Sequence, residues 1–170
     1  MPSVGDLSTI ALLGAGVAAM YVLVRWFFGT PAPPYEKRNS LMSQGEQEFY
    51  HVLHGVVEGK WSVFAMVRMA DLLKVKPNIP KPHFWMNRIK AKHVDFLLCD
   101  SENLEPLLAI EFEDASRQRA DQQERDFFIR DALASAGLPI LRVKPQPKYN
   151  SSELRKTIYD ALGFEKRVKV

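Results

Sequence analysis

Three acidic residues stand in segments that are otherwise apolar. Asp95 lies within the run His93–Leu98, and Glu111 and Glu113 lie two positions apart at the end of the run Leu107–Glu113. Residues two apart on a strand share one face of a sheet, so Glu111 and Glu113 are expected side by side. Ionised carboxylates in apolar surroundings are costly unless something pairs with them, and neighbouring carboxylates repel. A divalent metal such as Mg²⁺, which prefers oxygen ligands, would resolve both problems.

A purely structural interpretation of these acids is equally compatible with their spacing. Asp95 could cap a turn or pair with a lysine such as Lys92. Glu113 could simply be exposed where its strand ends. In that case the three carboxylates need no metal, and the choice depends on how the surrounding elements place them.

The segments around these acids predict an α/β arrangement. His93–Leu98 and Leu107–Glu113 have the composition of strands, separated by a turn, and predict an antiparallel hairpin. A helix over 119–136, closed by Gly137, and a strand over Pro139–Val143 follow. Strand, helix and strand at this spacing predict a β–α–β unit whose two strands are parallel.

Further elements are expected on both sides of this unit. Ser43 and Glu46 have the spacing of a capping box, so a helix is expected to begin at Ser43. The apolar stretch from Trp61 to Met66 predicts a strand that runs into a turn or short helix around Ala70–Leu73. A final helix is expected over Ser152–Leu162.

Between Asp71 and Asp95 every charged residue is basic. The six cations are Lys74, Lys76, Lys81, Arg88, Lys90 and Lys92. Cationic side chains bind phosphates, and rings such as Phe84 and Trp85 can stack on unpaired bases, so this segment is a candidate nucleic-acid-binding surface. The alternative is a solvated loop in which Phe84 and Trp85 are tucked into the core.

The N-terminal segment is apolar and long enough to cross a bilayer. Leu7–Val24 carries no charge and would form a helix about 27 Å long, close to the roughly 30 Å of a hydrocarbon core. Aromatic residues follow it, so residues 7–28 are expected to contact the membrane. The basic residues after this run are Arg25, Lys37 and Arg38. The positive-inside rule therefore places the rest of the chain in the cytoplasm. The alternative is the buried helix of a soluble protein.

The composition predicts four parts: an anchor over 1–29, a proline-rich linker over 30–42, a folded domain over 43–165 and a basic tail over 166–170. The 170 residues are 46% hydrophobic and 25% charged, which excludes a disordered or collagen-like protein. The net charge of +3 permits nucleic acid or anionic lipid as a partner. The one cysteine, Cys99, cannot form an internal disulfide, so a reducing compartment is expected.

The motifs of the folded domain resemble, in order and spacing, those of the PD-(D/E)XK nuclease superfamily. They are His93-Val94-Asp95-Phe96, Ile110-Glu111-Phe112-Glu113 and Gly137-Leu138-Pro139-Ile140-Leu141-Arg142, within a match that runs from about Ser43 to Val143. The chain is most similar to a bacterial domain-of-unknown-function family in the Vsr-like branch. The resemblance implies a restriction-endonuclease-like mixed sheet flanked by helices, here preceded by one transmembrane helix.

The resemblance also implies roles for individual residues. Asp95 and Glu111 would be the ligands of Mg²⁺ or Mn²⁺, and Glu113 would be the third catalytic residue, orienting the attacking water. Glu46 on the first helix would support the site. The position of Glu113 is usually lysine in the superfamily, although a minority of active members use glutamate there, and Arg117 stands where relatives have histidine.

The function that the resemblance implies is that of a membrane-anchored, metal-dependent endonuclease hydrolysing DNA phosphodiester bonds. It would be a single-pass protein of the bacterial inner membrane with its C-terminal domain in the cytoplasm. Glutamate in place of lysine keeps a second interpretation open, a catalytically inactive nuclease fold that binds nucleic acid or a protein partner at the membrane. A third, a structural membrane adaptor, predicts neither metal binding nor salt-sensitive DNA affinity.

Overall fold

The computed structural model describes residues 4–29, 32–113 and 120–163, and within these it leaves the side chains of 4, 6 and 120–126 undescribed. The chain divides into two compact units, Met1–Asn39 and Ser40–Val170. Arg117 and the basic tail over 166–170 lie outside the described residues.

The first unit contains one helix, α1, over Val4–Phe28. Its segment Leu7–Phe28 has a mean hydropathy of 2.1 and no buried part, and it is long and apolar enough to span a membrane. The apolar side chains along this segment are exposed, with Trp26 at 78%. The helix ends at Gly29, which has φ of 57° and donates its N–H to the Arg25 carbonyl.

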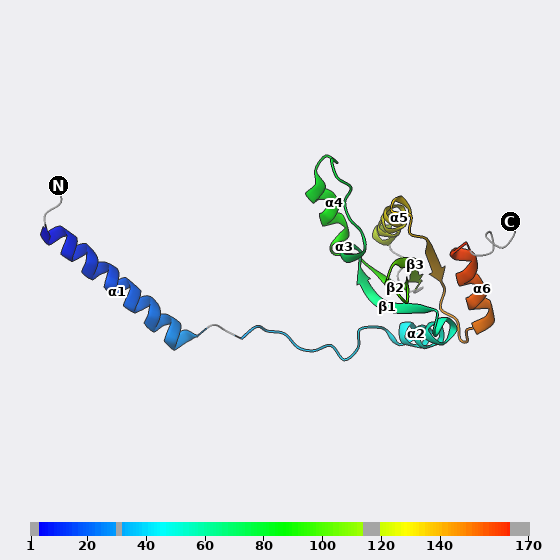
Figure 1. The fold of residues 1–170 in the computed structure, drawn as a ribbon. Coiled ribbons are helices and arrows are strands. Elements are labelled where there is room, and N and C mark those ends of the chain that lie inside the picture. Colours follow the sequence, from blue (N-terminus) through cyan, green and yellow to red (C-terminus); the bar gives the residue numbers. More distant parts are fainter. Residues whose placement is uncertain (1–3, 30–31, 114–119, 164–170) are drawn as a thin grey trace. The chain divides into compact units, whose positions relative to one another are not determined.

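The second unit is built on a mixed sheet of four strands in the order β1-β2-β3-β4 (Figure 1). The strands are β1 (Trp61–Arg68), β2 (His93–Asp100), β3 (Pro106–Phe112) and β4 (Ile140–Val143). The first three are antiparallel, and β4 runs parallel to β3 after the crossover through α5 (Ala120–Ser135). The predicted hairpin, β–α–β unit and α/β class are therefore confirmed.

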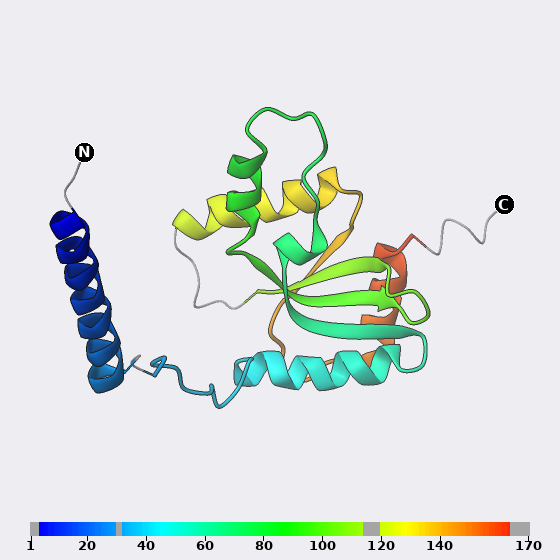
Figure 2. The same ribbon diagram turned by 60° about the vertical axis from the view of Figure 1, so that its left-hand side comes forward.

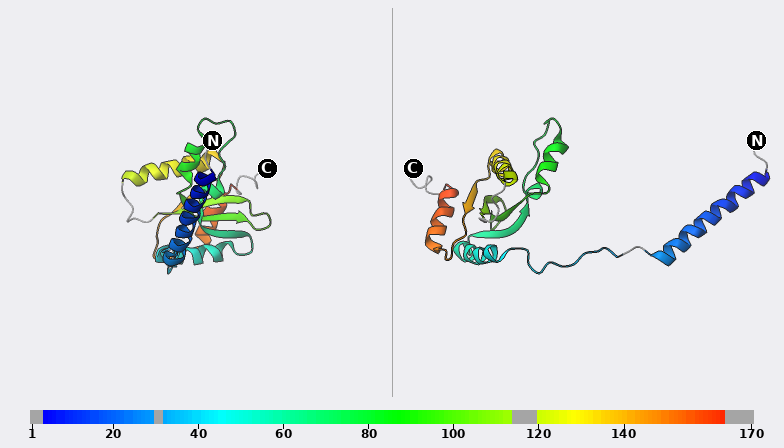
Figure 3. Two further views of the ribbon diagram at one scale, coloured as in Figure 1. Left: turned by 90° about the vertical axis from the view of Figure 1, so that its left-hand side faces the viewer. Right: turned by 180° about the vertical axis from the view of Figure 1, so that it is seen from behind.

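Helices cover both faces of this sheet, as Figures 2 and 3 show. On one face α2 (Gln44–Val57) and α6 (Ser151–Ala161) pack on a core that includes Phe49, Phe96 and Ile110, all fully buried. On the other face α3 (Met69–Leu72), α4 (Pro82–Ile89) and α5 pack on a second core with Leu97, Ala109 and Leu133. The central strands β2 and β3 contribute to both cores, which is why they are apolar on both sides.

The helix ends follow the sequence closely. Ser43 caps α2, with its hydroxyl accepting from the Glu46 N–H and the Glu46 carboxylate accepting from the Ser43 N–H, so the capping box is confirmed. Gly137 closes α5 with φ of 76°. Glu113 lies one residue past the end of β3 rather than inside it.

One helix, α4, was not predicted. It has eight residues, fewer than an apolar pattern needs to indicate a helix, although Pro82 in its first turn is a helix-start residue. Lys81 precedes it in the left-handed conformation, at φ of 55°. The predicted basic segment is thus a loop followed by a two-turn helix rather than a loop throughout.

Candidate active site

Asp95 and Glu111 occupy equivalent positions on the two central strands. The β2–β3 ladder includes Phe96 opposite Ile110, and Asp95 and Glu111 are the next residue of each strand beyond that pair. Opposed residues of an antiparallel pair project to the same face. Because this is also the face of Leu97 and Ala109, the two acids lie on the α5 side of the sheet.

Asp95 is held in one orientation by the backbone of the neighbouring strand. Its side chain is buried, with the residue 4% exposed, and Oδ2 accepts the N–H of Phe112 at 2.8 Å. The Asp95 carboxylate thus accepts a backbone N–H of β3 just beyond the last backbone pair of β2 and β3. Oδ1 lies 3.8 Å from Nε2 of His93, two residues earlier on the same face.

Glu111 extends this group towards β4. Its residue is half-buried and its Oε1 is shielded from solvent. In the parallel β3–β4 pair Glu111 is opposite Arg142, which places that arginine on the same face of the sheet. The carboxylates of the central strands therefore have a guanidinium as their neighbour on the next strand.

Glu113 pairs with that arginine. Its backbone N–H donates to the Val143 carbonyl at 2.8 Å, and its Oε1 lies 3.6 Å from Nη1 of Arg142. Both side chains are about 40% exposed, so the pair is open to solvent. A cation is thus present beside position 113, which itself carries a carboxylate.

The structure places Glu46 in a structural role at the start of α2. The residue is 5% exposed, and its Oε2 accepts both the N–H of Ser43, at 2.7 Å, and the Ser43 hydroxyl, at 2.9 Å. A methyl group on the preceding residue, Gly45, would lie 3.5 Å from the ring of Phe112. The Glu46 carboxylate is therefore part of the helix cap. Phe112, the last residue of β3, lies close to the start of this helix.

The first strand is irregular opposite Asp95. The β1–β2 register includes Ala65 and Val67 but skips Met66, which has φ of 54°. A methionine in the left-handed region is strained by roughly 1–2 kcal/mol. Such strain is concentrated at functional sites, and here it lies across the sheet from the buried carboxylate.

The structure brings two carboxylates, those of Asp95 and Glu111, to one face of the central strands. Among the described residues no group of three or more His, Cys, Asp and Glu side chains is close enough to hold a metal ion. Mg²⁺ commonly takes only one or two carboxylates and completes its shell with waters and substrate phosphate. Asp95 and Glu111 are the two carboxylates on adjacent strands and one face, whereas Glu113 is engaged with Arg142.

The basic segment presents its aromatic residues to solvent. Phe84 is 52% exposed and Trp85 is 41% exposed, so the alternative that tucked both rings into the core is wrong. Lys74, Lys76, Lys81 and Lys90 are exposed, and Arg88 and Lys92 are half-buried. Lys92, proposed from the sequence as a partner of Asp95, has its ammonium 5.4 Å from the centre of the Phe128 ring.

His93 and Arg142 are site residues that the sequence analysis did not single out. Both could have been found from strand geometry. His93 is two positions from Asp95 on one strand, and Arg142 falls opposite Glu111 once the β–α–β unit is aligned.

Comparison with known families gives one result that covers most of this domain. Residues 38–162 match the family described as "Protein of unknown function (DUF2726)". The chain belongs to this family. No curated protein and no solved structure matches it. The DUF2726 match includes the whole sheet, the candidate site and the basic segment, and it begins after the apolar helix α1.

Proposed function

We propose that this DUF2726 protein is a membrane-anchored, metal-dependent nuclease of the PD-(D/E)XK type that hydrolyses DNA phosphodiester bonds. The observation that carries the proposal is the placement of Asp95 and Glu111 at matching positions on β2 and β3, on one face of the sheet. Two carboxylates on adjacent central strands, one of them buried, are what a site for a hard divalent cation requires.

The architecture is compatible with this proposal. A restriction-endonuclease-like domain is expected to have a mixed sheet with helices on both faces, and the second unit has β1 to β3 antiparallel, β4 parallel and helices on either side. The order helix, hairpin, helix, strand is the one that the motif resemblance implies.

In this mechanism each residue has a separate task. Asp95 and Glu111 would hold Mg²⁺ or Mn²⁺, which supplies activation of water and neutralisation of phosphate charge when bound. The Phe112 N–H keeps the Asp95 carboxylate from rotating. Glu113 would orient the attacking water and accept its proton, and Arg142 would hold the Glu113 carboxylate in place.

The helix α1 would anchor the enzyme in the bacterial inner membrane. Arg25, Lys37 and Arg38 follow the apolar segment, so the catalytic unit would face the cytoplasm, where Mg²⁺ and DNA are available. The cations Lys74, Lys76, Lys81, Arg88, Lys90 and Lys92 would bind the phosphates of the substrate.

The test is cleavage of single-stranded and double-stranded DNA by the full chain in detergent, with Mg²⁺, with Mn²⁺ and with EDTA. We expect metal-dependent cleavage that is lost in Asp95→Asn and in Glu111→Gln. Arg155→Gln on the exposed side of α6 serves as a control that retains cleavage. Unchanged cleavage in either acid variant would end the mechanism.

One observation favours a second candidate function. Glu113 stands where lysine is usual, and it is already paired with Arg142. A nuclease fold that binds nucleic acid or a protein partner at the membrane without cleaving would tolerate this arrangement. Salt-sensitive DNA binding without cleavage under any metal condition would select this candidate. An adaptor with neither activity would show no DNA binding at all.

A further inference from the structure

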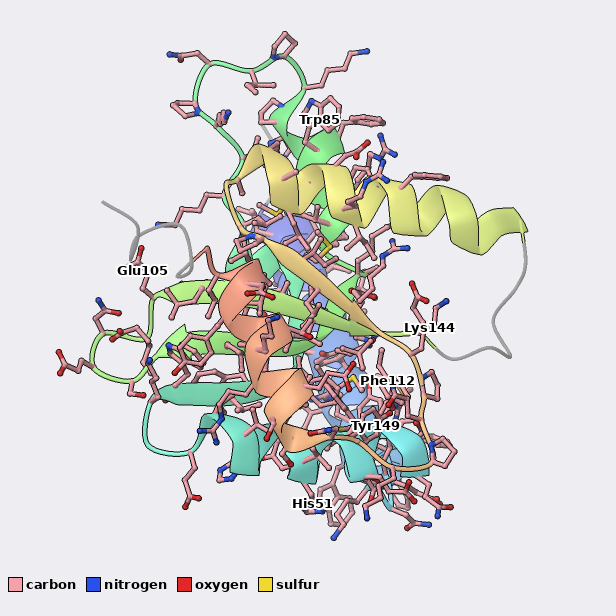
Figure 4. All side chains as sticks on the ribbon, turned by 90° about the vertical axis from the view of Figure 1, so that its right-hand side faces the viewer. His51, Trp85, Glu105, Phe112, Lys144 and Tyr149 are labelled. Carbon is pink, nitrogen blue, oxygen red and sulfur yellow. The ribbon has the colours of Figure 1, made fainter. Side chains whose placement is uncertain are left out.

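A groove of about 520 Å³ lies between α5 and the segment that contains α4. We call it the α4–α5 groove, and Figure 4 shows Trp85 on α4 beside α5. Its lining includes Leu73, Lys76, Ile79, Trp85, Arg88 and Phe128. The volume falls in the range of roughly 300–1,000 Å³ that is typical of sites for small ligands. Part of the lining, including Phe128, comes from α5, which is distant in sequence from the basic segment, so the sequence of that segment alone does not predict the groove.

Aromatic rings surround one guanidinium at this groove. The Cζ atom of Arg88 lies 4.0 Å from the ring centre of Phe128 and 5.9 Å from those of Phe84 and Trp85. The ring of Phe128 also has Lys92 Nζ at 5.4 Å. Rings and cations are thus arranged together, which suits a ligand that has both a π-face and negative charge.

The groove is unusually apolar for a solvent-exposed and cationic surface. Trp85 is 41% exposed and Ile79 is 37% exposed, although both line it. Every charged residue from Leu72 to Val94 is basic. The acidic residue on the described lining, Asp131, is paired with Arg130 at 3.2 Å. The charge of the occupant is therefore expected to be negative.

The groove lies on the same face of the sheet as the candidate active site. Phe128, which lines the groove, has the Lys92 ammonium 5.4 Å from its ring centre, and the next residue, His93, has its Nε2 3.8 Å from Oδ1 of Asp95. Both the groove helices and the acidic residues are on the α5 face of the sheet. Lys92 is thus a cation between Phe128 of the groove and the strand that carries Asp95.

We propose that the α4–α5 groove binds single-stranded nucleic acid, with an unpaired base against Trp85 and flanking phosphates on Lys74 and Lys76. Every base has a π-face, so aromatic stacking of this kind is tolerant of sequence. This inference rests on the proposed nuclease function in one respect. It takes the strand bound in the groove to be the substrate strand that is cleaved at Asp95 and Glu111. An acidic peptide would meet the charge but has no reason to continue towards two carboxylates.

The experiment measures binding of a fluorescent oligonucleotide to the full chain in detergent, with EDTA present so that cleavage does not interfere. Single-stranded DNA is compared with the same sequence as a duplex. We expect tighter binding of the single strand. Trp85→Ala should weaken it by roughly 10-fold or more, and Trp85→Phe, which keeps a ring, should weaken it much less.

Matched controls separate the groove from general surface effects. Phe127→Ala removes an exposed ring of α5 that does not line the groove and should leave affinity unchanged. Lys74→Gln with Lys76→Gln should reduce the slope of log affinity against log salt by about 1.4, as expected for two lost phosphate contacts on a single strand. Arg155→Gln with Lys156→Gln on α6 should leave that slope unchanged. Thermal unfolding of each variant checks that the fold is intact.

The outcomes distinguish this inference from the proposed nuclease function. If the groove variants lose affinity for the single strand but no protein cleaves DNA, the groove proposal is supported and the nuclease proposal is wrong. If the protein cleaves DNA with metal but Trp85→Ala does not change its affinity, the nuclease proposal is supported and the groove proposal is wrong. Equal losses in Trp85→Ala and Phe127→Ala, equal affinity for duplex and single strand, or tighter binding of a peptide of alternating Glu and Phe would each overturn the groove proposal.

Discussion

The carboxylate of Asp95 on β2 accepts the backbone N–H of Phe112 on β3 at 2.8 Å, in a buried position. This contact occupies the place of a main-chain acceptor where the ladder ends. Asp95 therefore has a structural role as a hydrogen-bond acceptor and a proposed role as a metal ligand. Substitution can separate these roles, because the hydrogen bond requires only an oxygen atom whereas the metal site requires the charge.

Asp95→Asn and Asp95→Ala should therefore differ in stability but not in activity. The asparagine oxygen can still accept the Phe112 N–H, whereas alanine leaves that buried donor unsatisfied, at a cost of about 1–3 kcal/mol. Urea unfolding of the full chain in detergent measures the difference. We expect cleavage to be lost in both variants. Equal destabilisation of the two would show that the hydrogen bond is not what holds this end of the sheet together.

Glu113→Gln should reduce cleavage strongly and stability little. The Glu113–Arg142 pair is about 40% exposed, so its loss is expected to change the free energy of unfolding by no more than about 1 kcal/mol. Removal of a proton acceptor typically slows a reaction by roughly 10²–10⁴-fold. Single-turnover cleavage at saturating Mg²⁺ is the measurement.

Arg142→Lys provides the matched control for this pair. It keeps a cation beside Glu113 and should retain most of the cleavage activity. Arg142→Ala removes that cation and should slow cleavage, but by less than Glu113→Gln does. If Glu113→Gln cleaves as fast as the parent protein, Glu113 has no catalytic task and the water must be oriented by another group.

Ser43→Ala tests the capping box of α2. It removes the hydroxyl that contacts the Glu46 carboxylate and backbone, and loss of such a cap costs about 1 kcal/mol. Glu46→Gln should cost less, because glutamine also serves in a capping box. Thermal unfolding gives both values. A loss of cleavage in Glu46→Gln at unchanged stability would show that this carboxylate supports the site, as the resemblance implies.

Much of the sheet could be predicted from the sequence because its information is local. The apolar runs around Asp95 and Glu111, the turn between them and Gly137 after α5 define a hairpin and a crossover with few alternatives. For the same reason the cap at Ser43 was predictable. Alternation along one strand predicts a shared face only for Glu111 and Glu113, and the register of β2 and β3 is what sets Asp95 beside Glu111.

The remainder depends on contacts between distant segments. The helix α4 has eight residues, too few for its apolar pattern to be recognised, and the groove lies where Phe128 of α5 is beside Arg88. The pairing of Glu113 with Arg142 requires the parallel register of β3 and β4 in atomic detail. Glu46 was given two roles from the sequence, one in the capping box of α2 and one in support of the site. Its described contacts are those of the cap.

Cys99 should make stability fall at high pH. Burial raises the pKa of its thiol above the ordinary value of 9.0. The thiol of the unfolded chain therefore ionises first as pH rises, so the stability is full below pH 9.0 and declines as the pH passes through the folded-state pKa. Unfolding free energies measured from pH 7 upwards should show this decline, and Cys99→Ala should show a shallower one. Parallel curves would assign the decline to other groups.

Gly137→Ala and Gly55→Ala should have opposite effects on stability, although an added methyl meets no atom within 4 Å at either position. Gly137 has φ of 76°, and the next residue, Leu138, donates its N–H to the Leu133 carbonyl and is buried beside it. Alanine in this left-handed position should cost about 1–2 kcal/mol, because the turn that brings β4 beside β3 cannot change without loss of that contact.

Gly55 is the matched control because it lies within α2 at an ordinary helical position. Alanine there should stabilise the protein by about 0.5 kcal/mol, since it reduces the entropy of the unfolded chain. The two variants are compared by thermal unfolding under one condition. A neutral Gly137→Ala would mean that the chain after α5 adopts another turn at no cost. The parallel register that sets Arg142 opposite Glu111 would then have to be maintained by the β3–β4 ladder alone.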